Sequence, residues 1–351
     1  MTATEVVTGR RGVGVAERLR ILLPYAAALW CLGYGTLAVY WASGGAGFPL
    51  GVGDPRGGDM GSWLVAAEPG SAGLVIAFGC AAGLVAALRT RSPQTGRVPR
   101  RAAAVVLLVV AAPLLLVVPD VRVLQSMAYG LQGYVGLVDW PVVNQLLCAF
   151  GGALLAGTAA SLLSGPRCPR CDRPHAEPGS AARWARIGRW ATAVAVVAPL
   201  PYAVQRAVWV LGVPLGVDRQ FIRDLLADME SKGLGPLVVY SLPLSAVAGA
   251  LLTLGLSMRW GTVLPRWVPY LGGRRVPVAL AVIPATVVAV AVTTAGMAPY
   301  QQIIPDGLPV TGSGAPALLW LPWGIALGLA TLAYHRRRLE TCSGSCSRSP
   351  R

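Results

Sequence analysis

Eight apolar blocks, each about as long as a membrane-spanning helix, constrain this chain of 351 residues more than any other feature. A helix needs roughly 20 apolar residues to cross the hydrocarbon core of a bilayer. The blocks cover residues 21–41, 72–88, 102–118, 141–163, 190–213, 236–257, 276–297 and 315–334. Only 13% of the residues are charged, which is about half the share found in soluble domains. The sequence therefore predicts an all-α integral membrane protein with eight transmembrane helices.

Charged residues alternate in sign from one connection to the next, and this predicts the topology. The net charge is +15, and 24 of the 30 basic residues lie in the two terminal segments and in every second connection. The four remaining connections hold ten of the fifteen acidic residues. Because basic loops stay in the cytoplasm, both termini are predicted to be cytoplasmic. Topology explains the positive charge, so we expect no nucleic-acid partner.

The chain also contains an internal repeat. The pattern Y-x6-W-x2-G begins at Tyr34 and again at Tyr202, and a Pro-Leu-Gly-Val segment follows each copy. Four crossings in each half would point both halves the same way, related by an axis along the membrane normal. The predicted divisions are a first four-helix repeat with a basic N-terminal tail (1–164), a cytoplasmic Arg-rich loop (165–188), a second four-helix repeat (189–338) and a cytoplasmic tail (339–351).

Three features of the sequence predict local structure. Residues 218–232 place apolar side chains on one helical face behind Asp218, a suitable N-cap, so we expect an amphipathic helix at the outer surface. The connection at 119–140 is expected to be partly helical. In the last block, Gly324 and Gly328 lie four residues apart, a spacing that lets helix backbones approach closely in lipid. We expect a packing contact there.

Arg206 is the one basic side chain embedded in an apolar block. It lies roughly 24 Å beyond the cytoplasmic end of its helix, in the outer third of the bilayer. Tyr202 and Trp209 share its helical face, so the guanidinium is expected to stack on Trp209 or to extend outward. Its expected ion partner is an outer carboxylate among Asp54, Asp120, Asp139, Asp218 and Asp306. The first half has Ala38 at the equivalent position.

Two roles remain open for Arg206, a structural one at the outer interface and a functional one in recognising a ligand or gating. Other polar residues at the same predicted end would line a vestibule with it, and these are Asn144, Gln145 and Gln301. Parallel repeats often rock about a central site. The leading hypothesis is therefore binding or transport of a small molecule at the interface of the two repeats, with Arg206, Tyr202 and Trp209 at the site.

A cysteine pair suggests a second, cytoplasmic site. Cys168 and Cys171 form a C-P-R-C turn, and His175 follows it. Such a turn is typical of half a zinc site, and Cys342 and Cys346 on the same predicted side would supply further ligands. Zinc, a redox-active dithiol and ordinary thiols all remain open. The alternative function is a scaffold or regulator that binds zinc or a partner through this loop, and zinc is the only cofactor indicated.

Signals for catalysis are scarce. Both histidines, His175 and His335, lie outside the apolar blocks, no carboxylate lies inside one, and no Walker-type glycine loop occurs. The sequence therefore leans against an enzyme. An excess of Arg over Lys, with abundant Ala, Gly, Val and Pro, indicates a high-GC bacterial genome and hence a bacterial plasma membrane. The expected partners are the lipid bilayer, a small-molecule ligand, and a second copy or another membrane protein.

Overall fold

The structure, a computed structural model, describes residues 15–89, 97–131, 133–164, 179–231, 236–266, 270, 272–300 and 312–339. These residues form an all-α fold without a β-strand among them. Seven of their helices are long and apolar enough to cross a membrane. The seven segments are Ile21–Ala42, Pro69–Arg89, Val98–Leu116, Trp140–Leu163, Ser180–Val210, Val278–Tyr300 and Gly314–Arg338. The prediction of an all-α, multi-pass membrane protein is therefore confirmed.

The predicted block at 236–257 corresponds to helix α9 (Pro236–Gly255). Its apolar part, Pro243–Gly255, is shorter than the other seven segments. The eighth span therefore stays a prediction.

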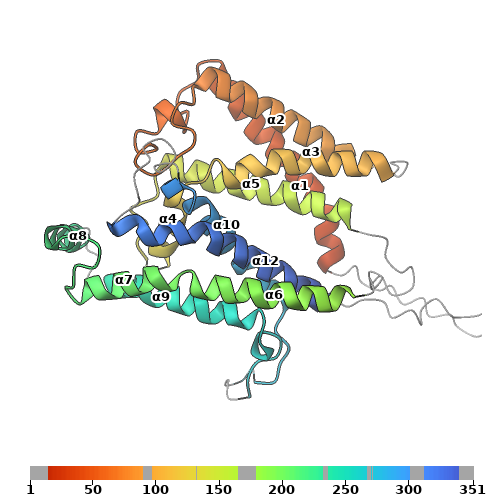
Figure 1. The fold of residues 1–351 in the computed structure, drawn as a ribbon. Coiled ribbons are helices and arrows are strands. Elements are labelled where there is room, and N and C mark those ends of the chain that lie inside the picture. Colours follow the sequence, from red (N-terminus) through yellow and green to blue (C-terminus); the bar gives the residue numbers. More distant parts are fainter. Residues whose placement is uncertain are drawn as a thin grey trace, which may run out of the picture. The chain divides into compact units, whose positions relative to one another are not determined.

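The chain forms two compact units, and the first comprises Met1–Phe48, Glu68–Leu114 and Ala149–Ser164. Its helices are α1 (Val15–Ala42), α2 (Pro69–Arg89), most of α3 (Arg97–Leu116) and the later part of α5 (Trp140–Leu163) (Figure 1). Aromatic rings line α1, where Trp30 stacks on Tyr34 with ring centroids 4.8 Å apart. Helix α2 packs closely on α1, because a Cβ added at Gly83 would lie 3.1 Å from the sulfur of Cys31.

The second unit comprises Pro49–Ala67, Leu115–Cys148 and Gly165–Arg351. Its helices are α4 (Val121–Gly130), the start of α5, α6 (Ser180–Val197), α7 (Leu200–Val210), α8 (Arg219–Ser231), α9, α10 (Val278–Ala295) and α12 (Trp320–Arg338) (Figure 1). Three 3-10 turns accompany them, η1 (Gly51–Gly53), η2 (Arg259–Gly261) and η3 (Gly312–Leu319). Helix α12 packs against both α6 and α10. Their shared core is rich in small side chains: Ala191, Ala195, Ala289, Ala326 and Ala330 join Leu256, Leu327 and Tyr334.

The predicted fifth span is broken in two, α6 and α7, around Pro199. Pro199 and Pro201 have no N–H, so the carbonyls of Ala195 and Val197 lose their helical donors. The N–H of Ala203 donates to the carbonyl of Pro199 at 3.0 Å, so helical bonding resumes at once. Arg206 consequently lies on the short helix beyond the break.

Helices α1 and α7 end in the same hydrogen-bonded cap. Gly44 and Gly212 have left-handed φ angles of +91° and +78°, which a side chain would disfavour. Each glycine N–H donates to the carbonyl three residues earlier, and the next N–H donates to the carbonyl five residues earlier. This is the Schellman motif. The tryptophans of the sequence pattern, Trp41 and Trp209, precede the glycines and are buried in both helices.

Helix α8 confirms that an amphipathic helix forms within 218–232, and its position at the outer surface stays a prediction. The side chain of Asp218 accepts a hydrogen bond from the N–H of Phe221 at 2.6 Å, as expected of an N-cap. The ring of Phe221 lies edge-on to Trp209 of α7 with centroids 5.4 Å apart, and Ile222 is buried. Helix α8 therefore packs on the end of α7. The 119–140 connection contains α4, so its expected helix is also confirmed.

We predict that Gly324→Ala destabilises the protein and that Gly328→Ala does not. A Cβ at Gly324 would lie 2.6 Å from the backbone nitrogen of Thr293, whereas one at Gly328 would lie 3.9 Å from the Cβ of Ala289. Overpacking of this kind costs about 1–3 kcal/mol. Thermal unfolding in detergent should show a lower midpoint for Gly324→Ala only. Equal midpoints for the two variants would contradict the close contact between α10 and α12.

Candidate functional site

Arg206 lies between two aromatic rings of its own helix. Its guanidinium carbon is 4.5 Å from the ring centroid of Trp209 and 5.2 Å from that of Tyr202. The expected stacking on Trp209 is therefore confirmed, and Tyr202 joins it. Trp209 is fixed in turn, because its indole N–H donates to the carbonyl of Leu215 at 2.9 Å.

The ring contacts leave the hydrogen-bonding groups of Arg206 unused. Among the residues that the structure describes, its side chain makes no hydrogen bond or ion pair, and its Nε is buried without an acceptor. A cation–π contact uses the face of the guanidinium, whereas the N–H groups point outward in its plane. Arg206 therefore retains donors in the geometry that binds a carboxylate or a phosphate.

The prediction that an outer carboxylate pairs with Arg206 is wrong for four of the five candidates. These four have different partners, which are Arg122 for Asp54 and Asp120, Arg56 for Asp139, and the first turn of α8 for Asp218. The fifth, Asp306, lies outside the described residues. The local sequence favoured Arg206 as the partner because it lies in an apolar block, but long-range packing brings other arginines to these carboxylates.

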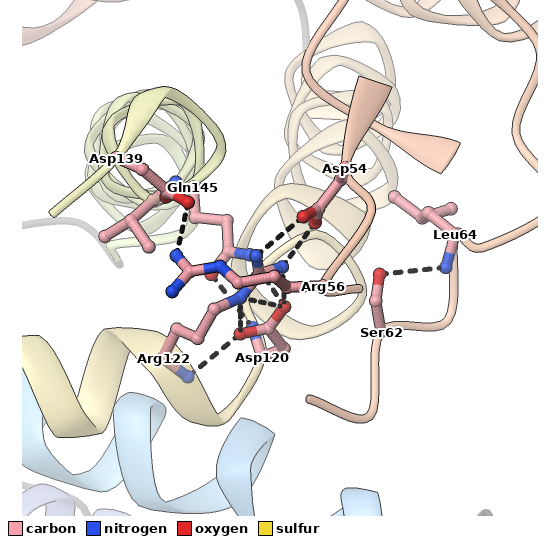
Figure 2. Close-up of polar contacts among 9 residues, drawn as sticks. Asp54, Arg56, Ser62, Leu64, Asp120, Arg122, Asp139 and Gln145 are labelled. Carbon is pink, nitrogen blue, oxygen red and sulfur yellow. Dashed lines mark hydrogen bonds and ion pairs between the residues drawn. The ribbon is translucent and has the colours of Figure 1, made fainter. Parts of the chain in front are cut away.

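A buried ion-pair network forms around Arg122 instead (Figure 2). The side chains of Arg122, Asp54 and Asp120 are only 3%, 5% and 1% exposed. The Nη1 of Arg122 donates to Asp54 at 2.8 Å, its Nη2 donates to both carboxylates, and its Nε donates to Asp120 at 3.0 Å. Each carboxylate therefore binds two nitrogens of one guanidinium, and the network links the 49–67 segment to the start of α4.

One guanidinium faces two carboxylates, and neutral hydrogen-bond donors stabilise the additional negative charge. Asp120 is the N-cap of α4, where it accepts the backbone N–H of Arg122 at 2.9 Å. The amide of Gln145 donates to Asp120 at 2.8 Å and accepts the backbone N–H of Asp120 at 3.2 Å. Charge-assisted hydrogen bonds of this kind are stronger than neutral ones. They extend the network to the first turns of α5.

The network holds Arg122 in its charged form. Burial alone lowers the pKa of Arg122, but hydrogen bonds and charge from Asp54 and Asp120 outweigh it and raise the pKa above its ordinary value. A raised pKa stabilises the fold below the unfolded-state value, and this contribution is lost only as the pH rises through the folded-state value. Because the unfolded value for arginine is already above the usual working range, titration of Arg122 leaves the network intact there.

The structure describes two of the three polar residues that were predicted to line a vestibule with Arg206. Gln145 contacts Asp120 rather than Arg206, and Asn144 is fully buried. Gln301 lies outside the described residues. The structure therefore places Tyr202 and Trp209 at Arg206, and it assigns Gln145 to the ion-pair network.

A small cavity adjoins the aromatic residues around Arg206. The ring of Trp320 lies edge-on to Tyr202 with centroids 5.5 Å apart. Trp320 also lines a cavity of about 180 Å³ together with Asp59, Met60, Gly61, Val121, Ala295, Ala298, Pro299, Gly314 and Ala317. Arg206 is not in this lining, and the carboxylate of Asp59 would repel an anion. The cavity is therefore a poor match to the donors of Arg206.

The proposed zinc ligands Cys168, Cys171, His175, Cys342 and Cys346 all lie outside the described residues, so the zinc site stays a prediction. The sequence analysis placed Asp54, Asp120 and Gln145 near Arg206, and it missed Arg122 and the network that these residues form with it. The network's only local signal is the sequence Pro119-Asp120-Val121-Arg122, in which an N-cap aspartate is followed by an arginine in a connection with few basic residues.

No protein-family model matches the chain, and no curated protein or solved structure matches it either.

We predict that Arg122→Gln destabilises the protein far more than Arg56→Gln. The first change leaves two buried carboxylates without their cation, a loss of about 3–5 kcal/mol. The second removes an ion pair to Asp139 whose side chains are 45% and 38% exposed, worth at most about 1 kcal/mol. Thermal unfolding in detergent compares the two. If Arg122→Gln unfolds no earlier than Arg56→Gln, the network does not hold this end of the second unit together.

Proposed function

We propose that this multi-pass membrane protein binds a small anionic molecule at Arg206 and carries it across the membrane. Several membrane-spanning helices follow from the fold. The ligand and its transport are inferences from the environment of one side chain. That side chain is the guanidinium of Arg206, which two rings hold by its face while the described residues offer it no carboxylate.

The energetics of a charged residue in a span favour a ligand-binding role for Arg206. A charged residue within a span costs about 2.5–3.5 kcal/mol at the bilayer centre and less near its surface. Cation–π contacts with desolvated rings contribute up to about 2 kcal/mol. The rings of Tyr202 and Trp209 thus offset much of the cost without consuming the in-plane donors, and an anionic ligand would supply the remaining stabilisation.

The break in this span supports the same proposal. Transporter sites are often built from discontinuous helices, whose interrupted hydrogen bonding is tolerated where the helix lines a cavity or packs against protein. Helices α6 and α7 meet near Pro199, and Arg206 follows within two turns of α7.

The proposal includes the topology that the sequence predicts. The protein would have eight spans with α9 as the sixth, arranged as two parallel four-helix repeats. Both termini would lie in the cytoplasm, and the protein would reside in a bacterial plasma membrane. The matching Schellman caps at Gly44 and Gly212 support a repeat. The segregation of basic and acidic connections supports the orientation.

We predict that small anions stabilise the wild-type protein through Arg206. The test is a thermal-shift screen of detergent-purified protein with acetate, lactate, succinate, inorganic phosphate and sulfate, followed by flux measurements in proteoliposomes for any anion that raises the midpoint. Arg206→Gln should abolish the shift and the flux. Arg206→Lys should weaken both, because a lysine keeps the charge but loses the planar fork.

The matched control is Arg219→Gln, which removes an exposed arginine from α8 of the same unit. It should leave the midpoint shift and the flux unchanged. A screen in which no anion raises the wild-type midpoint would contradict the proposal, as would an anion response that persists in folded Arg206→Gln protein.

A further inference from the structure

The first turns of α6 and the last turns of α12 lie together at one end of the second unit. A Cβ added at Gly188 of α6 would lie 3.2 Å from the Cβ of Ala333 in α12. Two arginines at this end hold neighbouring backbone. Arg337 donates to the carbonyl of Leu256 at 2.5 Å, and Arg338 donates to that of Val276 at 2.6 Å. These two side chains act in the fold itself.

Two other arginines at this end, Arg183 and Arg336, have no such partner. Each places its guanidinium carbon 5.9 Å from the ring centroid of Trp184, one from α6 and the other from α12. Both side chains are exposed, and among the described residues neither makes a hydrogen bond or an ion pair. Two positive charges therefore share one ring, and an anion between them would relieve their repulsion.

Each of these arginines begins an exposed apolar stripe along its own helix. Residues spaced by three, four or seven lie on one helical face. From Arg183 the stripe runs through Trp190, Val194 and Val197, which are 72%, 46% and 61% exposed. From Arg336 it runs back through Leu332, Leu329 and Ile325, which are 39%, 44% and 52% exposed. Both stripes belong to segments of membrane-spanning length.

We propose that Arg183, Trp184 and Arg336 bind the headgroup phosphate of an anionic phospholipid whose acyl chains lie along these two stripes. Guanidinium groups bind phosphate with paired hydrogen bonds, and tryptophan prefers the level of the headgroups. Basic sites between neighbouring membrane helices are the usual place for such lipids. Free phosphate would bind only the arginines, whereas a phospholipid would bind the arginines and also cover the apolar stripes. The inference does not depend on Arg206.

Native mass spectrometry of the detergent-solubilised protein tests this site. The protein is titrated with phosphatidylglycerol and, separately, with zwitterionic phosphatidylcholine. The wild type should retain phosphatidylglycerol in preference to phosphatidylcholine. Each single change, Arg183→Gln or Arg336→Gln, should weaken phosphatidylglycerol binding about five-fold, and the double variant should lose the preference. Arg183→Lys should keep part of the affinity because it keeps the charge.

The matched control is the double variant Arg100→Gln, Arg101→Gln, which removes two exposed arginines from α3 in the other unit. It has the same net charge as the double variant at the site and should bind phosphatidylglycerol like the wild type. Equal losses in the two double variants would show that overall charge alone attracts the lipid, and would overturn the site.

Two further outcomes would also overturn the proposal. Binding of inorganic phosphate as tight as that of phosphatidylglycerol would mean that the arginines bind phosphate without a contribution from the lipid chains. A dimer that retains no lipid in the wild type, and that dissociates in the double variant, would mean that a second copy covers these faces.

Discussion

A bilayer offers no hydrogen-bond partners, so each polar group of a spanning chain must be satisfied by protein or lie at the end of a helix. Much of the described part of this protein follows that constraint, and Arg206, whose Nε is buried without an acceptor, is an exception. The three ion pairs of this described part join residues in the connections and short helices between the spans. In the second unit, Arg337 and Arg338 close the opposite end by donating to backbone carbonyls. Small side chains in their shared core then let α6, α10 and α12 pack closely.

Two arginines show opposite solutions to the same problem. Arg122 is saturated by Asp54 and Asp120, which occupy its in-plane donors, so it can join segments of the fold but has little capacity left for a ligand. Arg206 is held by the faces of Tyr202 and Trp209, which leave those donors unused. The difference in contacts, rather than a difference in charge, assigns a structural role to Arg122 and makes Arg206 the candidate for recognition.

Features set by local rules were predictable from the sequence, and features set by long-range packing were not. Long apolar blocks predicted the spans, and Asp218 predicted the start of α8 because an N-cap acts within one turn. The Y-x6-W-x2-G pattern predicted only a repeat, and the structure adds that its glycines, Gly44 and Gly212, end α1 and α7 with left-handed φ angles. Asp54 and Arg122 are 68 residues apart, and no local rule predicts that Asp54 pairs with Arg122 rather than with Arg206. The direction of Gln145, toward Asp120, follows from the same packing.

Site-directed labelling tests the central claim, a topology set by charge with α9 crossing the membrane, most directly. In a background without native cysteines, Ala227→Cys probes α8 and Tyr270→Cys probes the connection after α9, where the native side chain is 97% exposed. An impermeant maleimide added to intact cells should label Ala227→Cys, and Tyr270→Cys only after the membrane is permeabilised. Labelling of both positions from the same side would contradict the account.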